Sequence, residues 1–217
     1  MTSALDPDRL LALSYVPMAR RSALEALWRL DVTFGAILAT GTQAMVSRIR
    51  LAWWREALER LDAQGAPAEP VLQALATYVL PTVTGAELAA MEAGWAELVS
   101  EEPLDGAALA LYAEGRGATL FRLSARLLGV PDFAVEAAGR RWALTDLARR
   151  SGTAAEAGAA IAAAPGGDDR HWPSQLRPLG MLSVLTRRDL VRPIGTWERQ
   201  GSPARMLRML KHRLTGR

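Results

Sequence analysis

The chain has 217 residues, of which half are hydrophobic, and it contains no cysteine and only two histidines, His171 and His212. It is long enough to bury one sizeable core, and its composition excludes disulfides, thiolate zinc sites, iron–sulfur clusters and histidine metal clusters. The formal net charge of +3 hides an asymmetry, because residues 170–217 carry 11 Arg and Lys against 2 acids, a balance of +9, while residues 1–169 carry −6. Such a basic tail favours contact with phosphate groups or a partner.

Helical periodicity recurs along nearly the whole chain, and no sustained period-2 alternation is present. Helices are predicted over 18–40, 47–62, 71–80 and 106–128, and in the alanine-rich stretch 133–164. Another helix is predicted to begin at a T-x-x-E capping box formed by Thr84 and Glu87. A loop at 165–173 precedes two short helices at 176–191 and 203–214. We therefore predict an all-α protein with a bundle core over 1–164 and, over 165–217, a loop and basic helical tail packed on the same domain.

Two charged residues lie within apolar helix faces. Arg50 falls in the middle of the apolar sector of SRIRLAWWREAL, residues 47–58, and Asp31 lies inside the apolar stripe of the 18–40 helix. A guanidinium on a buried face needs a partner, which could be an anionic ligand, a protein carboxylate, or water that the long side chain reaches. One interpretation is a buried ion pair between Asp31 and Arg50. The other is a polar pocket between facing helices.

Other residues join these two as candidates for a ligand cavity. The adjacent pair Trp53 and Trp54 is expected in the core or, alternatively, in the wall of a lipid pocket. Gly115 and Gly117 interrupt a helical pattern, either for close helix packing or for the approach of a ligand chain. Asp146 and Arg149 are expected to lie near each other on one helical face, as a surface or half-buried pair. The candidate ligand-binding residues are Asp31, Arg50, Trp53, Trp54, Tyr112, Gly115, Asp146 and Arg149.

The last predicted helix has an apolar face opposite a basic face, and the basic side chains are Arg205, Arg208, Lys211 and Arg213. Such a helix can lie on an anionic membrane surface or dock on a protein partner. No apolar run is as long as a membrane span, and the N-terminus lacks the features of a signal peptide. We therefore expect a cytoplasmic protein, with peripheral binding at the inner membrane as an option. No nucleic-acid-binding signature is present, and we expect no nucleic-acid partner.

Motifs for common catalytic sites are absent: there is no G-x-S-x-G, no phosphate-binding glycine loop and no dinucleotide fingerprint. Any metal would have to be a hard cation held by carboxylates. Catalysis through such a cation needs two helices that each present acids at positions i and i+4, and no such pair of repeats is present. We therefore expect neither a bound metal nor a catalytic residue.

Several segments together resemble the squalene and phytoene synthase family of all-α prenyl-transferring enzymes. These are Tyr15 and Pro17, ARRSALEALWRLD, SRIRLAWWREAL, EPVLQAL, LYAEGRGATLFRLSARLLGV and GRRWALTDLAR, which together cover roughly residues 9–150. The resemblance implies a single helical bundle around a central cavity, with the chain shortened after Ala164. It also implies an isoprenoid or other lipid ligand.

Family enzymes join two isoprenyl diphosphates with magnesium held by two aspartate-rich motifs. By the resemblance, the first motif falls at about Gly35, Ala36 and Ala39 and the second at about Arg150 and Ala154, so both motifs lack their acids. An arginine at a metal position also repels the cation. The chain most resembles a non-catalytic branch that includes an assembly factor for respiratory complex I. The alternative is an active prenyltransferase whose Mg²⁺ is held by a rearranged set such as Asp31, Asp146 and Glu114.

Overall fold

The computed structural model describes residues 4–41, 43–99, 104–167 and 171–217, which form helices and loops without a β-strand. The predicted all-α class is confirmed. The helical elements in chain order are α1 (Pro7–Ser14), α2 (Met18–Thr40), α3 (Ala44–Arg60), α4 (Pro70–Tyr78), α5 (Gly85–Ala89), α6 (Met91–Ala96), η1 (Glu97–Val99), α7 (Gly106–Tyr112), η2 (Ala113–Ala118), α8 (Thr119–Leu127), α9 (Glu136–Arg150), α10 (Ala154–Ala163), η3 (Ser174–Leu176), α11 (Arg177–Leu190) and α12 (Pro203–Thr215).

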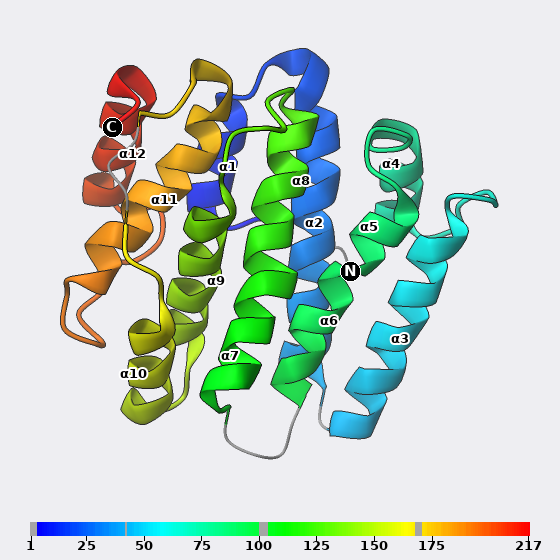
Figure 1. Cartoon of the computed structure of the whole chain (residues 1–217), viewed down its shortest axis with the longest axis horizontal. Coiled ribbons are helices and arrows are strands. Elements are labelled where there is room, and N and C mark those ends of the chain that lie inside the picture. Colours follow the sequence, from blue (N-terminus) through cyan, green and yellow to red (C-terminus); the bar gives the residue numbers. More distant parts are fainter. Residues whose placement is uncertain (1–3, 42, 100–103, 168–170) are drawn as a thin grey trace.

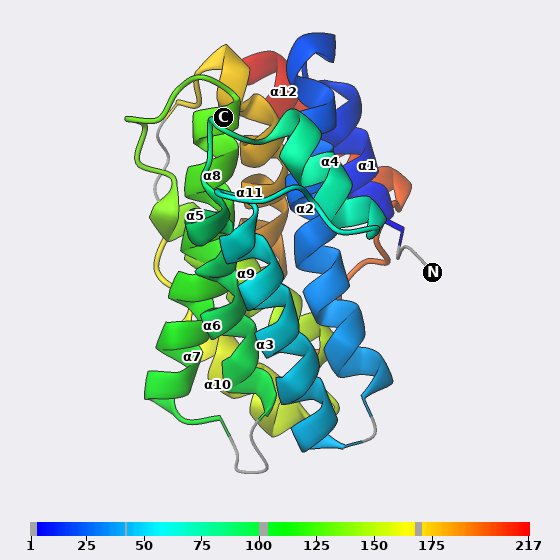
Figure 2. The ribbon, with the colours of Figure 1, turned by 90° about the vertical axis from the view of Figure 1, so that its right-hand side faces the viewer.

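The long helices lie side by side in one bundle. Figure 1 shows α7, η2 and α8 as one continuous helix, with α2 and α3 on one side and α9, α10 and α11 on the other. This continuous helix corresponds to the helix predicted over 106–128, and its middle part, η2, is a π-helix. The end of α2, the start of α3, the start of α7 and all of α10 lie at the same end of the bundle, the lower end in Figures 1 and 2.

Local signals explain where several helices begin. The capping box at the start of α5 is present as predicted, with the Thr84 hydroxyl accepting from the Glu87 backbone N–H at 3.2 Å. Asp6 caps α1, a helix that the hydrophobic pattern did not indicate, by accepting from the backbone N–H of Arg9 at 3.0 Å. The predicted 133–164 stretch is divided into α9 and α10 by a short turn that contains Gly152.

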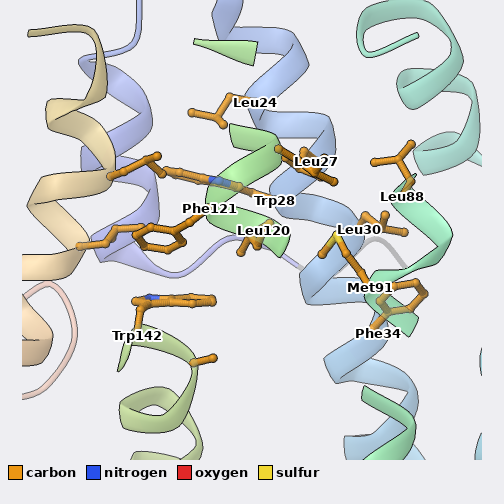
Figure 3. Packing of buried hydrophobic residues seen from close by; sticks show 14 of the residues in the cluster. Leu24, Leu27, Trp28, Leu30, Phe34, Leu88, Met91, Leu120, Phe121 and Trp142 are labelled. Atoms are coloured by element: carbon orange, nitrogen blue, oxygen red, sulfur yellow. The ribbon is translucent and has the colours of Figure 1, made fainter. Parts of the chain in front are cut away.

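One hydrophobic core runs through the bundle, and Figure 3 shows part of it, around the junction of α2, α8 and α9. Trp28 of α2 is buried and donates its indole N–H to the hydroxyl of Ser124 on α8 at 3.2 Å. Phe121 of α8 packs on Trp142 of α9 with 5.8 Å between ring centroids. Large aromatic rings at this junction fix the positions of the three helices relative to one another.

Glycines allow two pairs of helical segments to approach backbone to backbone. A Cβ on Gly115 would lie 2.6 Å from the backbone nitrogen of Gly94 in α6, and one on Gly117 would lie 2.3 Å from the backbone oxygen of Gly139 in α9. Both distances are shorter than any van der Waals contact. The close packing proposed for these glycines is therefore present, and the cost of glycine inside a helix is offset by tight helix contact.

The C-terminal helix α12 lies against α1 and α11. Arg205 is buried and pairs with Asp8 of α1 and Asp189 of α11, at 2.9 and 2.8 Å. His212 is buried in the same helix, and its ring lies edge-on to Trp172. Ion pairs and packing thus hold α12 on the bundle, and the face that the basic pattern assigned to solvent includes a buried arginine.

Candidate functional site

A cavity of about 900 Å³ lies inside the lower half of the bundle, between α2, α6, α7, α9 and α10. Its volume is in the upper part of the range of small-molecule pockets. Most of its wall is apolar or small, and the residues that line it are Arg9, Asp31, Val32, Gly35, Ala36, Leu38, Ala39, Trp95, Leu98, Leu104, Leu109, Tyr112, Arg116, Leu147, Arg150, Ser151, Gly152, Ala155, Glu156 and Ala159.

The cavity has a buried polar floor and an exposed mouth. The floor is formed by three polar residues that are each at most 2 % exposed: Asp31, Arg116 and Tyr112. At the other end, Ala39 and Glu156 of the lining are exposed. These lie near the end of α2 and at the start of α10, so the mouth opens at the lower end of the bundle in Figure 1.

Asp31 is the centre of the polar floor. Its carboxylate accepts from Arg9 Nη2 at 2.7 Å, from Arg116 Nε at 2.9 Å and from the indole N–H of Trp95 at 3.2 Å. Burial by itself raises the pKa of Asp31, but the charges of Arg116 and Arg9 outweigh it, and the net pKa lies below its usual value. Asp31 is therefore a fully ionised carboxylate within the core.

Arg116 is held by aromatic rings as well as by carboxylates. Its guanidinium carbon lies 4.3 Å from the ring centre of Trp95 and 4.7 Å from that of Trp142. One of its nitrogens donates to the phenol oxygen of Tyr112, and another lies 2.8 Å from the Asp146 carboxylate. Burial raises the pKa of Tyr112 to about 12, so the phenol stays protonated at neutral pH.

Asp146 joins the floor to the cavity wall. Besides Arg116, it accepts from Arg150 Nε at 3.1 Å, one turn later on α9. Burial opposes the charge of Asp146, yet Arg116 and Arg150 lower its pKa to about 2. The three arginines of the lining, Arg9, Arg116 and Arg150, are thus all paired with carboxylates.

The positions that the resemblance assigned to the first aspartate motif lie in the cavity wall. Gly35, Ala36 and Ala39 of α2 line the cavity on one side, and Arg150, from the second motif, lines it on the other. Ala154 is exposed at the start of α10 and is not part of the lining. None of these side chains offers an oxygen ligand, and the described residues contain no group of three acidic or histidine side chains placed to hold a metal.

The predicted ion pair between Asp31 and Arg50 is wrong. Arg50 is exposed on α3, near its start, whereas Asp31 pairs with Arg9 and Arg116. The carboxylate considered as a partner for Arg50 is therefore not Asp31, and the exposed side chain of Arg50 reaches solvent at the edge of the buried sector of α3. The hydrophobic pattern correctly placed Asp31 in the core but did not single out Arg9 or Arg116.

The other candidate residues are divided between cavity, core and surface. Tyr112 lines the cavity as predicted, while Trp54 packs in the core, edge-on to Phe34 with 6.2 Å between ring centroids. Trp53, expected in the core or a pocket wall, is 47 % exposed. Gly115 contacts α6 and is absent from the cavity lining.

Asp146 and Arg149 do not form the predicted pair. Asp146 faces Arg116 and Arg150, whereas Arg149 pairs with Asp189 of α11 at 3.2 Å. Positions three apart on a helix diverge by about 60°, so each side chain contacts a different neighbouring element. Glu114, proposed for a rearranged metal site, is more than half exposed and pairs with Arg140 on the outside of the bundle at 2.6 Å.

The four tail residues also differ in their surroundings. Arg208 and Lys211 are exposed, as expected for a membrane or partner contact. Arg213 is half-buried, with its guanidinium 5.5 Å from the ring centre of Tyr15, and Arg205 is buried in ion pairs. The assignment of Arg205 to a contact surface is therefore wrong, because α1 packs on that side of α12.

The described residues form an all-α bundle around a cavity, as expected of an isoprenoid synthase-like fold. The family model for squalene/phytoene synthase matches residues 3–161, and the chain therefore belongs to the squalene/phytoene synthase family. The resemblance drawn from the sequence motifs is confirmed at the level of the family. Neither the curated proteins nor the solved structures contain a match to this chain.

Proposed function

We propose that this protein binds an uncharged or weakly polar isoprenoid-like lipid in its cavity and does not transfer prenyl diphosphates. The observation that carries the proposal is the chemistry of the wall at the motif positions. Gly35, Ala36 and Ala39 replace one set of expected acids, and Arg150 stands in the other. Ionisation of a diphosphate needs divalent cations on carboxylate ligands, and these four residues supply none.

The charges around the cavity support an uncharged ligand. The carboxylates of Asp31 and Asp146 pair with the arginines of the lining: Arg9 pairs with Asp31, Arg150 with Asp146, and Arg116 with both. A diphosphate at the floor would need cations free to pair with it, and the buried guanidiniums of Arg9 and Arg116 would first have to leave buried carboxylates. Breaking a buried pair costs about 3–5 kcal/mol. An uncharged head group avoids this cost.

The apolar part of the wall suits a hydrocarbon chain. Leucine and alanine side chains from α2, α7, α9 and α10 surround the space between floor and mouth, and the residues are Leu38, Ala39, Leu109, Leu147, Ala155 and Ala159. Burial of a chain here is driven by the hydrophobic effect. Tyr112 and Ser151 also line this space, and their hydroxyl groups, bonded to Arg116 and to the backbone oxygen of Leu147, are its polar contacts for a head group such as an alcohol.

An active transferase with a rearranged metal site is the alternative. It would need Asp31, Asp146 and Glu114 to share a metal, but the first two hold arginines and the third lies on the outside. The distribution of these carboxylates favours the non-catalytic proposal.

The test compares farnesol with farnesyl diphosphate. We expect the purified protein to bind farnesol and, with Mg²⁺ and farnesyl diphosphate, to release no pyrophosphate above a blank without protein. Ala36→Phe fills the cavity wall and should weaken farnesol binding by about tenfold or more, since the chain loses buried apolar contact. Ala19→Phe, at an exposed position of the same helix, is the matched control and should bind farnesol like the wild type.

Pyrophosphate release that depends on protein and Mg²⁺ would refute the non-catalytic part of the proposal. Equal farnesol affinity in wild type, Ala36→Phe and Ala19→Phe would refute the cavity as the binding site. Circular dichroism of each variant verifies that the fold is retained.

A contact through α12 remains a separate proposal. Leu207 and Leu214 are 70 % and 79 % exposed, and Arg208 and Lys211 lie beside them. This surface fits the expected contact with a protein partner, as in an assembly role, or with an anionic membrane. Arg208→Glu with Lys211→Glu should weaken that contact, and unchanged binding to anionic liposomes would contradict the membrane version.

A further inference from the structure

A second exposed apolar surface lies on the first three turns of α3. Met45, Val46, Ile49 and Trp53 are 64 %, 38 %, 62 % and 47 % exposed. On a helix with 100° per residue these four positions fall within a sector of about 100°, so they form one continuous stripe, which we call the α3 stripe. Large apolar side chains gathered in this way typically mark an interaction site, whereas single exposed ones do not.

Arginines flank the α3 stripe on both sides. Arg48 lies on one edge and Arg50 on the other, and neither forms an ion pair with a carboxylate in the described part of the chain. The helix carries no acidic residue before Glu56, which pairs with Arg60 at 3.1 Å. The stripe therefore combines apolar side chains, an indole and unpaired cations, the combination found where proteins meet the headgroup region of anionic bilayers.

The α3 stripe and the cavity mouth lie at the same end of the molecule. Both views show the start of α3 beside the end of α2, at the end where α10 lies. Arg48 Nη2 donates to the backbone oxygen of Val99 at 3.3 Å, and the preceding residue, Leu98, lines the cavity. The α3 stripe is thus connected, through Val99 and Leu98, to the wall of the cavity at the end of the bundle where the mouth lies.

We propose that the α3 stripe docks this end of the bundle on an anionic phospholipid bilayer, from which the ligand passes into the cavity. The inference rests on the proposed function: an isoprenoid-like ligand has low solubility in water and needs a route from the bilayer to the cavity that avoids water. Met45, Ile49 and Trp53 enter the interfacial region, while Arg48 and Arg50 extend to lipid phosphates. Within the described residues no helix is both long and apolar enough to cross a bilayer, so attachment would occur from one side.

Vesicle sedimentation tests the docking. Wild-type protein should bind vesicles of phosphatidylcholine with phosphatidylglycerol more tightly than vesicles of phosphatidylcholine alone. Ile49→Gln with Trp53→Gln should weaken binding to the mixed vesicles by about tenfold or more, because two buried apolar contacts are lost. Arg48→Gln with Arg50→Gln should remove the preference for the anionic lipid.

The matched control is Met18→Gln with Tyr78→Gln, which removes two exposed apolar side chains from the start of α2 and from α4, at the opposite end of the bundle, and should leave vesicle binding unchanged. The proposal is overturned if wild-type protein does not bind the mixed vesicles, if the α3 variants bind like the wild type, or if only the Arg208→Glu, Lys211→Glu variant of α12 loses binding. A dimer in light scattering that Trp53→Gln dissociates would also overturn it, since a second copy would then cover the stripe.

Delivery of farnesol by two routes separates this proposal from the proposed function. The Ile49→Gln, Trp53→Gln variant should take up farnesol from cyclodextrin like the wild type but take it up from mixed vesicles more slowly. If the wild type takes up farnesol by neither route but still binds vesicles, the proposed cavity ligand is refuted and the proposed docking surface still stands. If the variant and the wild type take up farnesol from vesicles at equal rates, the docking route is refuted and the proposed ligand still stands.

Discussion

Replacement of Asp31 by asparagine tests the polar floor of the cavity. The substitution keeps the shape of the side chain but removes the negative charge that faces Arg9 at 2.7 Å and Arg116 at 2.9 Å. The asparagine amide would also place donor hydrogens opposite the donors of these guanidiniums. Each arginine keeps one carboxylate, Asp6 at 3.1 Å for Arg9 and Asp146 at 2.8 Å for Arg116.

The magnitude follows from burial and from these remaining partners. Loss of one partner of a buried ion pair costs about 3–5 kcal/mol. Because Asp6 and Asp146 compensate part of the charge, we expect the lower end, about 3 kcal/mol. For a chain of this length that corresponds to a decrease in Tm of about 6–12 °C. The total free energy of unfolding of such proteins is about 5–15 kcal/mol, so the variant would still fold.

Chemical denaturation followed by circular dichroism at neutral pH measures the effect. Glu56→Gln is the control, because the pair between Glu56 and Arg60 is more than half exposed on both sides and its loss should cost less than about 1 kcal/mol. The combination Asp31→Asn with Arg9→Met should cost less than the sum of the two single changes, since Arg9→Met removes one of the two guanidiniums that face the lost carboxylate. A cost of Asp31→Asn below about 1 kcal/mol, or additive costs in the double variant, would refute the buried network as described.

Further substitutions test the packing of α12 on the bundle and the close approach of η2 to α9. Burial lowers the pKa of His212 from 6.5 to about 4. Between these two pH values the histidine takes up a proton in the unfolded chain but not in the folded one. The free energy of unfolding should therefore fall by up to about 3 kcal/mol as the pH decreases from 6.5 to 4. In His212→Met this loss should be absent from pH titrations of stability, and an unchanged slope would contradict the assignment. Gly117→Ala should cost about 1–3 kcal/mol in thermal denaturation because the new methyl collides with Gly139. Gly158→Ala, where the nearest atom would be 3.8 Å away, should instead stabilise by up to about 1 kcal/mol, and equal effects of the two changes would argue against the close approach.

Local properties of the sequence determined the elements and the class of fold. Helices form where apolar side chains recur with helical spacing and where caps such as the Thr84 and Glu87 box satisfy the first backbone N–H groups. The pattern of α2 also placed Asp31 among apolar neighbours, and it is fully buried. These properties depend on residues a few positions apart, so a single chain reveals them. Motif order then identified the family and, through it, the wall positions Gly35, Ala36 and Ala39.

Only the tertiary structure decided which helix faces meet. Asp31 pairs with Arg9 and Arg116, which are 22 and 85 residues away, and no local pattern relates such positions. Arg50 was misplaced in the prediction because a helical projection shows only the direction of each side chain around the helix axis. It does not show which side of the helix a neighbouring element covers. Arg205 is buried for the converse reason, since α1 packs against a face of α12 that composition assigns to solvent. Periodicity therefore fixes what each helix can bury, whereas contacts between distant segments decide what it does bury.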